Sequence, residues 1–179
     1  MSTNPQNILL IVSDMWGFEH AMWLDNYILN LKDHFIIKRI DCNKIGKITA
    51  STENAIHQQF LDFGIDLVVE HILYYNQREV SILGFSIGGF IAWQAGHRGL
   101  SIKDFYAVSS TRLRLENYKP NTKSIHLYYG SDDSNIPNFD WHDMHSIKPN
   151  LIPNGNHLIY RKPEIAKKVC SDIISSCIV

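Results

Sequence analysis

The sequence lacks an excess of charge of either sign. Its 17 lysine and arginine residues nearly balance 18 aspartate and glutamate residues, which gives a formal net charge of −1. A chain of this kind is not drawn to nucleic acid by its overall charge, and we expect no nucleic-acid partner. Long apolar runs are also missing, because no segment approaches the ~20 apolar residues of a membrane-spanning helix. We therefore expect no membrane partner.

Cysteine is scarce and is not arranged in a recognisable framework. The three residues Cys42, Cys170 and Cys177 form an odd set without metal-site spacing, and the last two fall in one expected helix. The N-terminal residues lack a basic segment, and the apolar run 8–12 is too short for a signal peptide. We expect reduced thiols in a cytoplasmic protein that needs no metal or cofactor.

Strand-like and helix-like segments alternate along the 179 residues. Short apolar runs predict strands at 7–13, 35–41, 80–83, 104–109, 124–130 and 151–153. Helices are expected at 19–31, after Ser51 or Thr52, after residue 86, within 138–147 and from Pro163 onward, and residues 42–50 are expected to form a loop. The helix after Thr52 should bury the stripe Ile56, Phe60, Phe63 and Leu67, and the last helix Ile165, Val169 and Ile173. The alternation predicts one α/β domain over residues 1–179, with a doubly wound, mostly parallel sheet of about six strands.

The segment from Glu79 to Gly96 contains the most informative motif. An apolar run leads into Gly84-Phe85-Ser86-Ile87-Gly88, and a small-residue, helix-compatible segment follows. This order is typical of a nucleophile elbow, in which a serine sits on a sharp turn between a strand and a helix. The serine hydroxyl would then lie at a helix N-terminus, which favours developing negative charge. The alternative is a glycine-rich strand-to-helix turn without a chemical role.

A serine hydroxyl needs an adjacent base, and the base needs a group that orients it. Asp132 and Asp133 follow the predicted strand that ends at Gly130, and His157 follows the last predicted strand. The order serine, acid, histidine is the order in which the elbow architecture supplies these groups. A turn-forming aspartate and an ordinary loop histidine remain the alternatives.

These motifs resemble those of the α/β-hydrolases over nearly the whole chain. The segment 130–137 is similar to the family's G-x-x-D-x-x-V/I-P pattern, and Gly155-Asn156-His157 is similar to its histidine loop. The resemblance implies Ser86 as nucleophile, His157 as general base and then acid, and Asp133 as the group that orients His157. Asp132 is the second candidate for the acid, since the loop could be aligned one residue away.

The resemblance also implies an oxyanion hole made of two backbone N–H groups. One belongs to Ile87, the residue after the nucleophile, and the other to the loop after the first strand. The segment Asp14-Met15-Trp16-Gly17 is similar to the Glu-Ile-Phe-Gly loop of dienelactone hydrolases, which points to the Met15 N–H. Those enzymes carry a cysteine at the elbow, so their substrate is not carried over.

The sequence indicates less about the substrate than about the candidate catalytic residues. Residues 110–123 are too few to form a helical cap, so an open, shallow site is expected. Trp16, Phe85 and Arg112 are the candidate substrate-binding residues, although Trp16 could equally fill the edge of the core. Basic residues of the connection would lie at the rim and either bind an anionic group or form an ordinary charged loop: Arg112, Arg114, Lys119 and Lys123.

Three functions fit the sequence. The first is hydrolysis of small carboxylic esters through an acyl-enzyme, and the second uses the same groups on thioesters or for acyl transfer from CoA or an acyl carrier. The third is a binding protein that has kept the fold without activity. His142 and His145 stand near Asp140 and Asp143, but no third ligand has a diagnostic spacing, so a solvated or capping role is expected for them.

Overall fold

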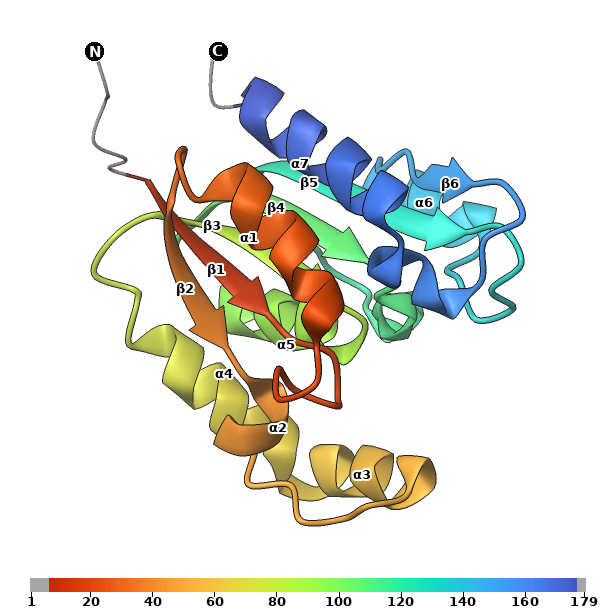
Figure 1. Ribbon diagram of the computed structural model, residues 1–179. Helices are drawn as coiled ribbons and strands as arrows, with labels where there is room; N and C mark the ends of the chain where they lie inside the picture. The colour runs from red at the N-terminus through yellow and green to blue at the C-terminus, as the bar shows by residue number, and fades with distance from the viewer. Residues whose placement is uncertain (1–6, 177–179) are drawn as a thin grey trace.

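The computed structural model describes residues 7–176, which contain one sheet of six parallel strands. The strand order is β2-β1-β3-β4-β5-β6, and Figure 1 shows the strands fanning out with their arrowheads toward one edge. The strands are β1 (Ile8–Val12), β2 (Ile36–Ile40), β3 (Val80–Phe85), β4 (Ile102–Val108), β5 (Thr122–Gly130) and β6 (Asn150–Ile152). The prediction of a doubly wound α/β fold with about six strands is therefore confirmed.

The register of the central strands sets where the chemistry can lie. Val12 of β1 pairs with Gly84 of β3, and Gly84 pairs with Ala107 of β4. Because parallel strands in register end at the same edge, the loops after β1, β3 and β4 meet there. Every residue of β3 is buried, as the continuous apolar run predicted for a strand covered on both faces.

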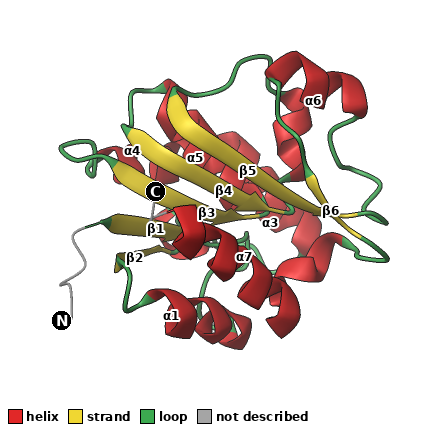
Figure 2. Cartoon of the chain, turned by 90° about the horizontal axis from the view of Figure 1, so that it is seen from above, coloured by secondary structure: helices red, strands yellow, loops and turns green. Residues whose placement is uncertain are grey.

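Helices cover both faces of the sheet (Figure 2). The helix α1 (Asp25–Leu31) and the helix α7 (Pro163–Ser176) lie on one face, and α4 (Ile65–Leu73) and α5 (Ile87–His97) lie on the other. The shorter helices are α2 (Cys42–Ile45), α3 (Glu53–Gln59) and α6 (Phe139–His145), and the 3-10 helices are η1 (Met22–Leu24), η3 (Thr111–Leu115) and η4 (His157–Arg161). The stripe Ile165, Val169 and Ile173 of α7 is buried as predicted. Each face of the sheet thus has its own apolar core.

Two predicted boundaries after β1 and β2 are wrong. The helix expected from Glu19 begins only with η1 at Met22, because the preceding loop is held by the Phe18 N–H donating to Asp41 Oδ2 at 3.0 Å. The segment expected to be a loop from residue 42 begins with the short helix α2. Asp41 caps that helix by accepting the Lys44 N–H at 3.0 Å.

The predicted stripe on the helix after Thr52 is correct only in its first half. Ile56 and Phe60 are buried, whereas Phe63 is 38% exposed. The chain forms a π-helix, η2 (Phe60–Gly64), between α3 and α4, and its wider turn rotates the later residues around the axis. The buried residues of α4 are therefore Val68, Val69 and Ile72, and they do not continue the predicted stripe. Thr52 occupies the N-cap position of α3, but its side chain makes no capping hydrogen bond.

The connection between β4 and β5 is short, as the sequence indicated. Residues 109–121 contain only η3, so no cap domain is inserted there. None of the described helices combines the length and the apolarity needed to cross a bilayer. Cys42 and Cys170 are buried free thiols, and Cys177, expected in the last helix, lies outside the described residues.

Candidate active site

A cavity of about 910 Å³ opens where the carboxyl ends of the strands meet. This edge is where open α/β sheets generally bind ligands. Ser86, Asp133 and His157 line the cavity together, although they follow three different strands. Met15 and Ile87 line it as well, so the three predicted catalytic residues and the two predicted oxyanion-hole residues all lie at one cavity.

Ser86 has the backbone conformation that the elbow motif requires. Its φ of 50° and ψ of −119° lie in a region that residues with a side chain rarely adopt. The turn is held from both sides, since the Ser86 N–H donates to the Val108 carbonyl at 2.9 Å and α5 starts at the next residue. A Cβ at Gly88 would overlap the carbonyl oxygens of Val12 and Ser13. Glycine at this position therefore lets α5 begin directly against the end of β1.

Ser86, His157 and Asp133 form a continuous chain of hydrogen bonds. Ser86 Oγ lies 2.9 Å from His157 Nε2, and His157 Nδ1 lies 2.6 Å from Asp133 Oδ2. The carboxylate can only accept, so the Nδ1 proton belongs to the histidine and Nε2 is left to accept from the serine hydroxyl. This tautomer is the one that a general base next to a serine must have.

Asp133, and not Asp132, contacts the histidine. The Asp133 side chain is only 5% exposed, and its Oδ1 accepts the Asn135 N–H at 3.0 Å, which fixes the carboxylate plane. Asp132 is exposed and accepts a hydrogen bond from Ser131 Oγ at 2.9 Å. Gly130 and Gly155 lie in such close contact that a Cβ at Gly130 would overlap the Gly155 carbonyl, and this contact holds the loops after β5 and β6 together.

Met15 and Ile87 are the residues predicted to supply the two oxyanion-hole N–H groups, and both line the cavity. Ile87 is the first residue of α5, where helix geometry leaves an N–H without an intrahelical acceptor. The carbonyl of Met15 accepts a hydrogen bond from Asn43 Nδ2 at 2.9 Å, which fixes the backbone of this loop from the other side. Both residues border the cavity beside Ser86.

Asp14, for which no role was predicted, has a carboxylate that organises the same loop. The residue is 2% exposed, and its carboxylate accepts from the Trp16 N–H at 3.0 Å and from the Tyr160 hydroxyl at 3.0 Å. Arg161 lies 3.4 Å from the same carboxylate. Burial raises the pKa of Asp14, and the hydrogen bonds from Tyr160 and the Trp16 N–H and the charge of Arg161 act in the opposite direction.

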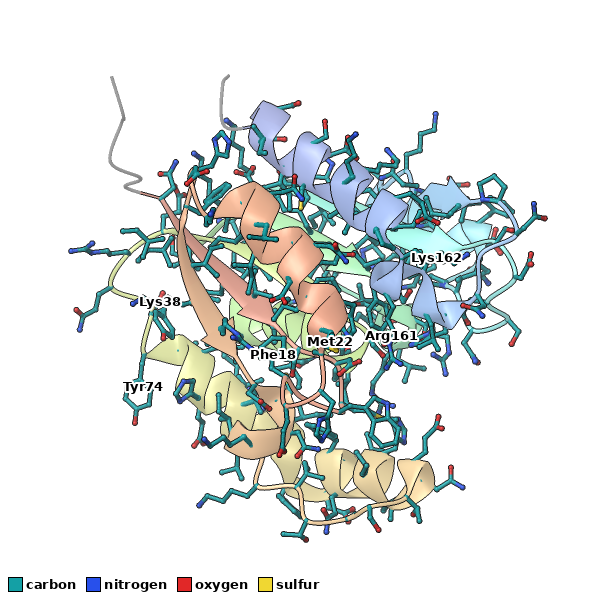
Figure 3. The ribbon with its side chains drawn as sticks, in the orientation of Figure 1. Phe18, Met22, Lys38, Tyr74, Arg161 and Lys162 are labelled. Atoms are coloured by element: carbon teal, nitrogen blue, oxygen red, sulfur yellow. The ribbon has the colours of Figure 1, made fainter. Side chains whose placement is uncertain are left out.

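The loop after β1 is thereby joined to the segment that follows His157. Tyr160 and Arg161 belong to η4, the 3-10 helix that starts at His157. Figure 3 labels Arg161 on the same side of the molecule as Phe18 and Met22, which belong to the segment between β1 and α1. Partners 146 residues apart in sequence carry no local pattern, so this link cannot be predicted from the sequence.

Two of the three predicted substrate-binding residues line the cavity. Trp16 is 44% exposed and borders it, as does Arg112. The prediction for Phe85 is wrong, because its ring is fully buried on the α1 and α7 face of the sheet. There it packs 4.8 Å from the rings of both Trp23 and Tyr27.

The four basic residues of the β4–β5 connection divide into two pairs. Arg112 and Arg114 border the cavity as expected. Lys119 and Lys123 do not: Lys119 donates to the His145 carbonyl at 3.1 Å, and Lys123 belongs to the first residues of β5, at the opposite edge of the sheet. The rim position predicted for this second pair is therefore wrong.

The histidines of α6 have a structural role in the described part of the chain. A solvated or capping role was expected for His142 and His145, and because both are buried the solvated role is wrong. His145 packs 4.3 Å from the Trp141 ring, and its Nε2 lies 3.1 Å from the Glu116 carbonyl. Within residues 7–176, no three histidine, cysteine or acidic side chains are grouped so as to hold a metal ion.

The protein is similar to known proteins in its structure and not in its sequence. No protein-family model matches the sequence, and no curated protein matches it either. Among solved structures, the chain is similar to an α/β serine hydrolase without lid from Xanthomonas campestris, with a TM-score of 0.64 and 15% identity over 97% of this chain and 84% of that one. It is also similar to Est1E from Butyrivibrio proteoclasticus, with a TM-score of 0.63 and 13% identity over 99% and 90% of the two chains.

These likenesses establish the fold, which is that of the α/β-hydrolases. The chain is a small member of this fold class, without a cap between β4 and β5. At such low identity the similarity identifies no substrate.

Proposed function

We propose that the protein is a serine hydrolase that cleaves carboxylic esters through an acyl-enzyme intermediate. The observation that carries the proposal is the continuous chain Ser86–His157–Asp133, with successive distances of 2.9 and 2.6 Å, at the border of an open cavity. A strained serine backbone beside it is a second, independent feature of a nucleophile, since strain of this kind persists only where the surroundings enforce it.

In the first half of the proposed reaction, Ser86 Oγ attacks the ester carbonyl carbon and its proton moves to His157 Nε2. The carbonyl oxygen becomes an oxyanion that accepts hydrogen bonds from the Met15 and Ile87 N–H groups. His157 then gives the proton to the leaving alkoxide. The carbon–oxygen bond breaks, an alcohol departs, and the acyl group stays on Ser86.

In the second half of the proposed reaction, a water molecule takes the place of Ser86 as the nucleophile. His157 removes a proton from a water molecule, the resulting hydroxide attacks the acyl carbon, and the proton is returned to Ser86 Oγ as the carboxylic acid leaves. Asp133 stays ionised throughout and holds the Nδ1 proton, so that the ring keeps its orientation and its positive charge is stabilised. A thioester would follow the same steps with a thiol as the leaving group.

The experiment is hydrolysis of 4-nitrophenyl butyrate and of butyryl-CoA by the purified chain. We expect turnover of the 4-nitrophenyl ester and a loss of kcat of roughly 10³-fold or more in Ser86→Ala and in His157→Ala. Ser175→Ala, an exposed serine on α7, is the matched control and should retain full activity. Preferred turnover of butyryl-CoA would move the proposal to thioesters, and turnover that survives in Ser86→Ala would contradict it.

A further inference from the structure

The 3-10 helix η3 brings two arginines to the same cavity as the serine. Arg112 and Arg114 both line the cavity, together with Ser86 and Ile87. The guanidinium carbon of Arg112 lies 5.1 Å from the centre of the Phe90 ring, on the first turn of α5. Since α5 starts directly after Ser86, this stacking fixes the Arg112 guanidinium beside the helix that carries the candidate nucleophile.

Neither guanidinium is neutralised by the described residues. No carboxylate of residues 7–176 forms an ion pair with Arg112 or Arg114 within 4.0 Å. Arg114 donates to the Thr111 carbonyl at 3.0 Å, and the buried Arg112 Nε has no hydrogen-bond partner within this part of the chain. Burial and the charge of Arg114 lower the pKa of Arg112, and the charge of Glu116 raises it.

Two of the three carboxylates that line the cavity have other partners. Asp133 is bonded to His157, and Asp14 to Tyr160 and Arg161. The third, Glu53, lies at the start of α3. Arg112 and Arg114 are thus without an ion pair among the described residues, and unpaired guanidinium groups favour a ligand that carries an oxyanion.

His57 lines the same cavity as the two arginines. It belongs to α3, which projects beyond the carboxyl ends of β1 and β2 in Figure 1. Burial lowers the pKa of His57, the charges of Arg112 and Arg114 lower it further, and Glu53 acts in the opposite direction. Arg112 and Arg114 of η3 and His57 of α3 thus line the same cavity as Ser86, and the charges of the two arginines act on His57.

We propose that Arg112 and Arg114 bind an anionic group of the substrate, a carboxylate or a phosphate, at one end of the cavity while the ester carbonyl lies at Ser86. That the substrate is an ester rests on the proposed function, whereas the binding of an anion by the two arginines does not. A guanidinium binds either group through two parallel N–H donors, and a cavity of about 910 Å³ holds both an acyl group and its charged end. The substrate class is thus a small ester with a negative charge on one of its two halves.

The first test measures binding without catalysis. In the Ser86→Ala protein, the pKa of His57 is followed by NMR while glutarate or inorganic phosphate is added. We expect the pKa of His57 to rise with saturation, because a bound anion neutralises the two arginines. The rise should be lost in Arg112→Gln and in Arg114→Gln. A rise with glutarate alone identifies a carboxylate site, and a rise with phosphate alone identifies a phosphate site.

The second test compares two esters of equal acyl length, 4-nitrophenyl pentanoate and mono-4-nitrophenyl glutarate. The ratio of their kcat/KM values should favour the glutarate ester, and it should fall at least tenfold in Arg112→Gln or Arg114→Gln. Arg78→Gln, which removes an exposed arginine just before β3 at the opposite edge of the sheet, is the matched control and should leave the ratio unchanged.

The outcomes separate the two proposals. If neither ester is hydrolysed, the proposed function fails, and the titration of His57 still decides the anion site. If both are hydrolysed with a ratio that neither arginine alters, and neither anion shifts the pKa of His57, the anion site is wrong. Because Arg112→Gln also loses the stacking on Phe90, Arg112→Lys and the exposed Arg114→Gln provide the answer should that variant fail to fold.

Discussion

The Tyr160 hydroxyl donates to the Asp14 carboxylate at 3.0 Å and so ties the segment after His157 to the loop that carries Met15. One bond therefore connects the candidate base to the candidate oxyanion hole. Burial raises the pKa of Asp14, whereas the hydrogen bonds from Tyr160 and the Trp16 N–H and the charge of Arg161 lower it. The geometry of the two loops depends on these contacts as a set.

Tyr160→Phe should lower both stability and turnover. The ring stays in place, but a buried carboxylate loses one donor, which costs about 1–3 kcal/mol in the free energy of unfolding. The loosened Met15 N–H should reduce kcat several-fold, less than the roughly 100-fold cost of losing an oxyanion donor outright. Urea unfolding and ester kinetics measure the two effects.

Tyr27→Phe is the matched control for this variant. The Tyr27 hydroxyl donates to the Tyr160 carbonyl at 2.9 Å in the same aromatic cluster, and it does not contact Asp14. We expect a comparable loss of stability with a smaller change in kcat. Equal losses of kcat in both variants would show that the Asp14 contact has no specific role.

Asp133→Asn should lower kcat by roughly 10²- to 10⁴-fold. An amide at this position can present its NH₂ group to His157 Nδ1, which favours the tautomer that cannot accept from Ser86. Asp132→Asn should change kcat by less than about twofold, because its carboxylate is bonded to Ser131. The reverse ranking of the two variants would transfer the acid to Asp132.

Gly88→Ala should destabilise the protein and weaken catalysis together. The new methyl group would meet the backbone carbonyls of Val12 and Ser13, and the shift needed to relieve this costs about 1–3 kcal/mol. The shift also moves the loop that carries Met15, so kcat should fall. Ala92→Gly in the same helix costs about 1 kcal/mol through helix propensity and should retain kcat. A fully active Gly88→Ala protein would refute the proposed coupling.

Stability should fall as the pH drops below neutrality, and His142 should contribute to the fall. Burial lowers the pKa of His142 in the folded chain below its ordinary value of 6.5, and His145 lowers it further. The unfolded chain then binds the proton first, so the contribution is complete above about pH 6.5 and is lost as the pH falls toward the folded pKa.

Urea midpoints at about pH 7.5 and about pH 5.5 measure this effect. The loss of stability between the two pH values should be smaller in His142→Gln than in the unmodified chain. His34→Gln, which removes an exposed histidine, should show the same loss as the unmodified chain. An identical loss of stability in all three proteins would show that His142 does not contribute to the pH dependence.

The sequence was sufficient for the parts of the site that depend on local turns and on chain order. The glycines on both sides of Ser86 indicate the sharp turn between a strand and a helix. The loops of Asp133 and His157 follow parallel strands, and the carboxyl ends of parallel strands lie at the same edge of the sheet. The structure brings these three side chains into contact, and their catalytic roles remain a prediction that the variants above test.

Other features depend on contacts that no local pattern records. Phe85 follows Gly84 within the motif, yet the pleat of β3 directs its ring to the α1 and α7 core, a side that the sequence does not specify. The π-helix before α4 adds one residue to a turn and so breaks the stripe expected at Phe63. Asp14 and Tyr160 meet only after the whole sheet has formed.

The most direct test of the central claim is covalent labelling by a fluorophosphonate, which reacts with an activated serine hydroxyl. We predict one adduct per chain, located on Ser86 by peptide mass spectrometry, with no adduct in Ser86→Ala and strongly slowed labelling in His157→Ala. Folded protein that takes up no label, or that carries the label on another serine, would contradict the account.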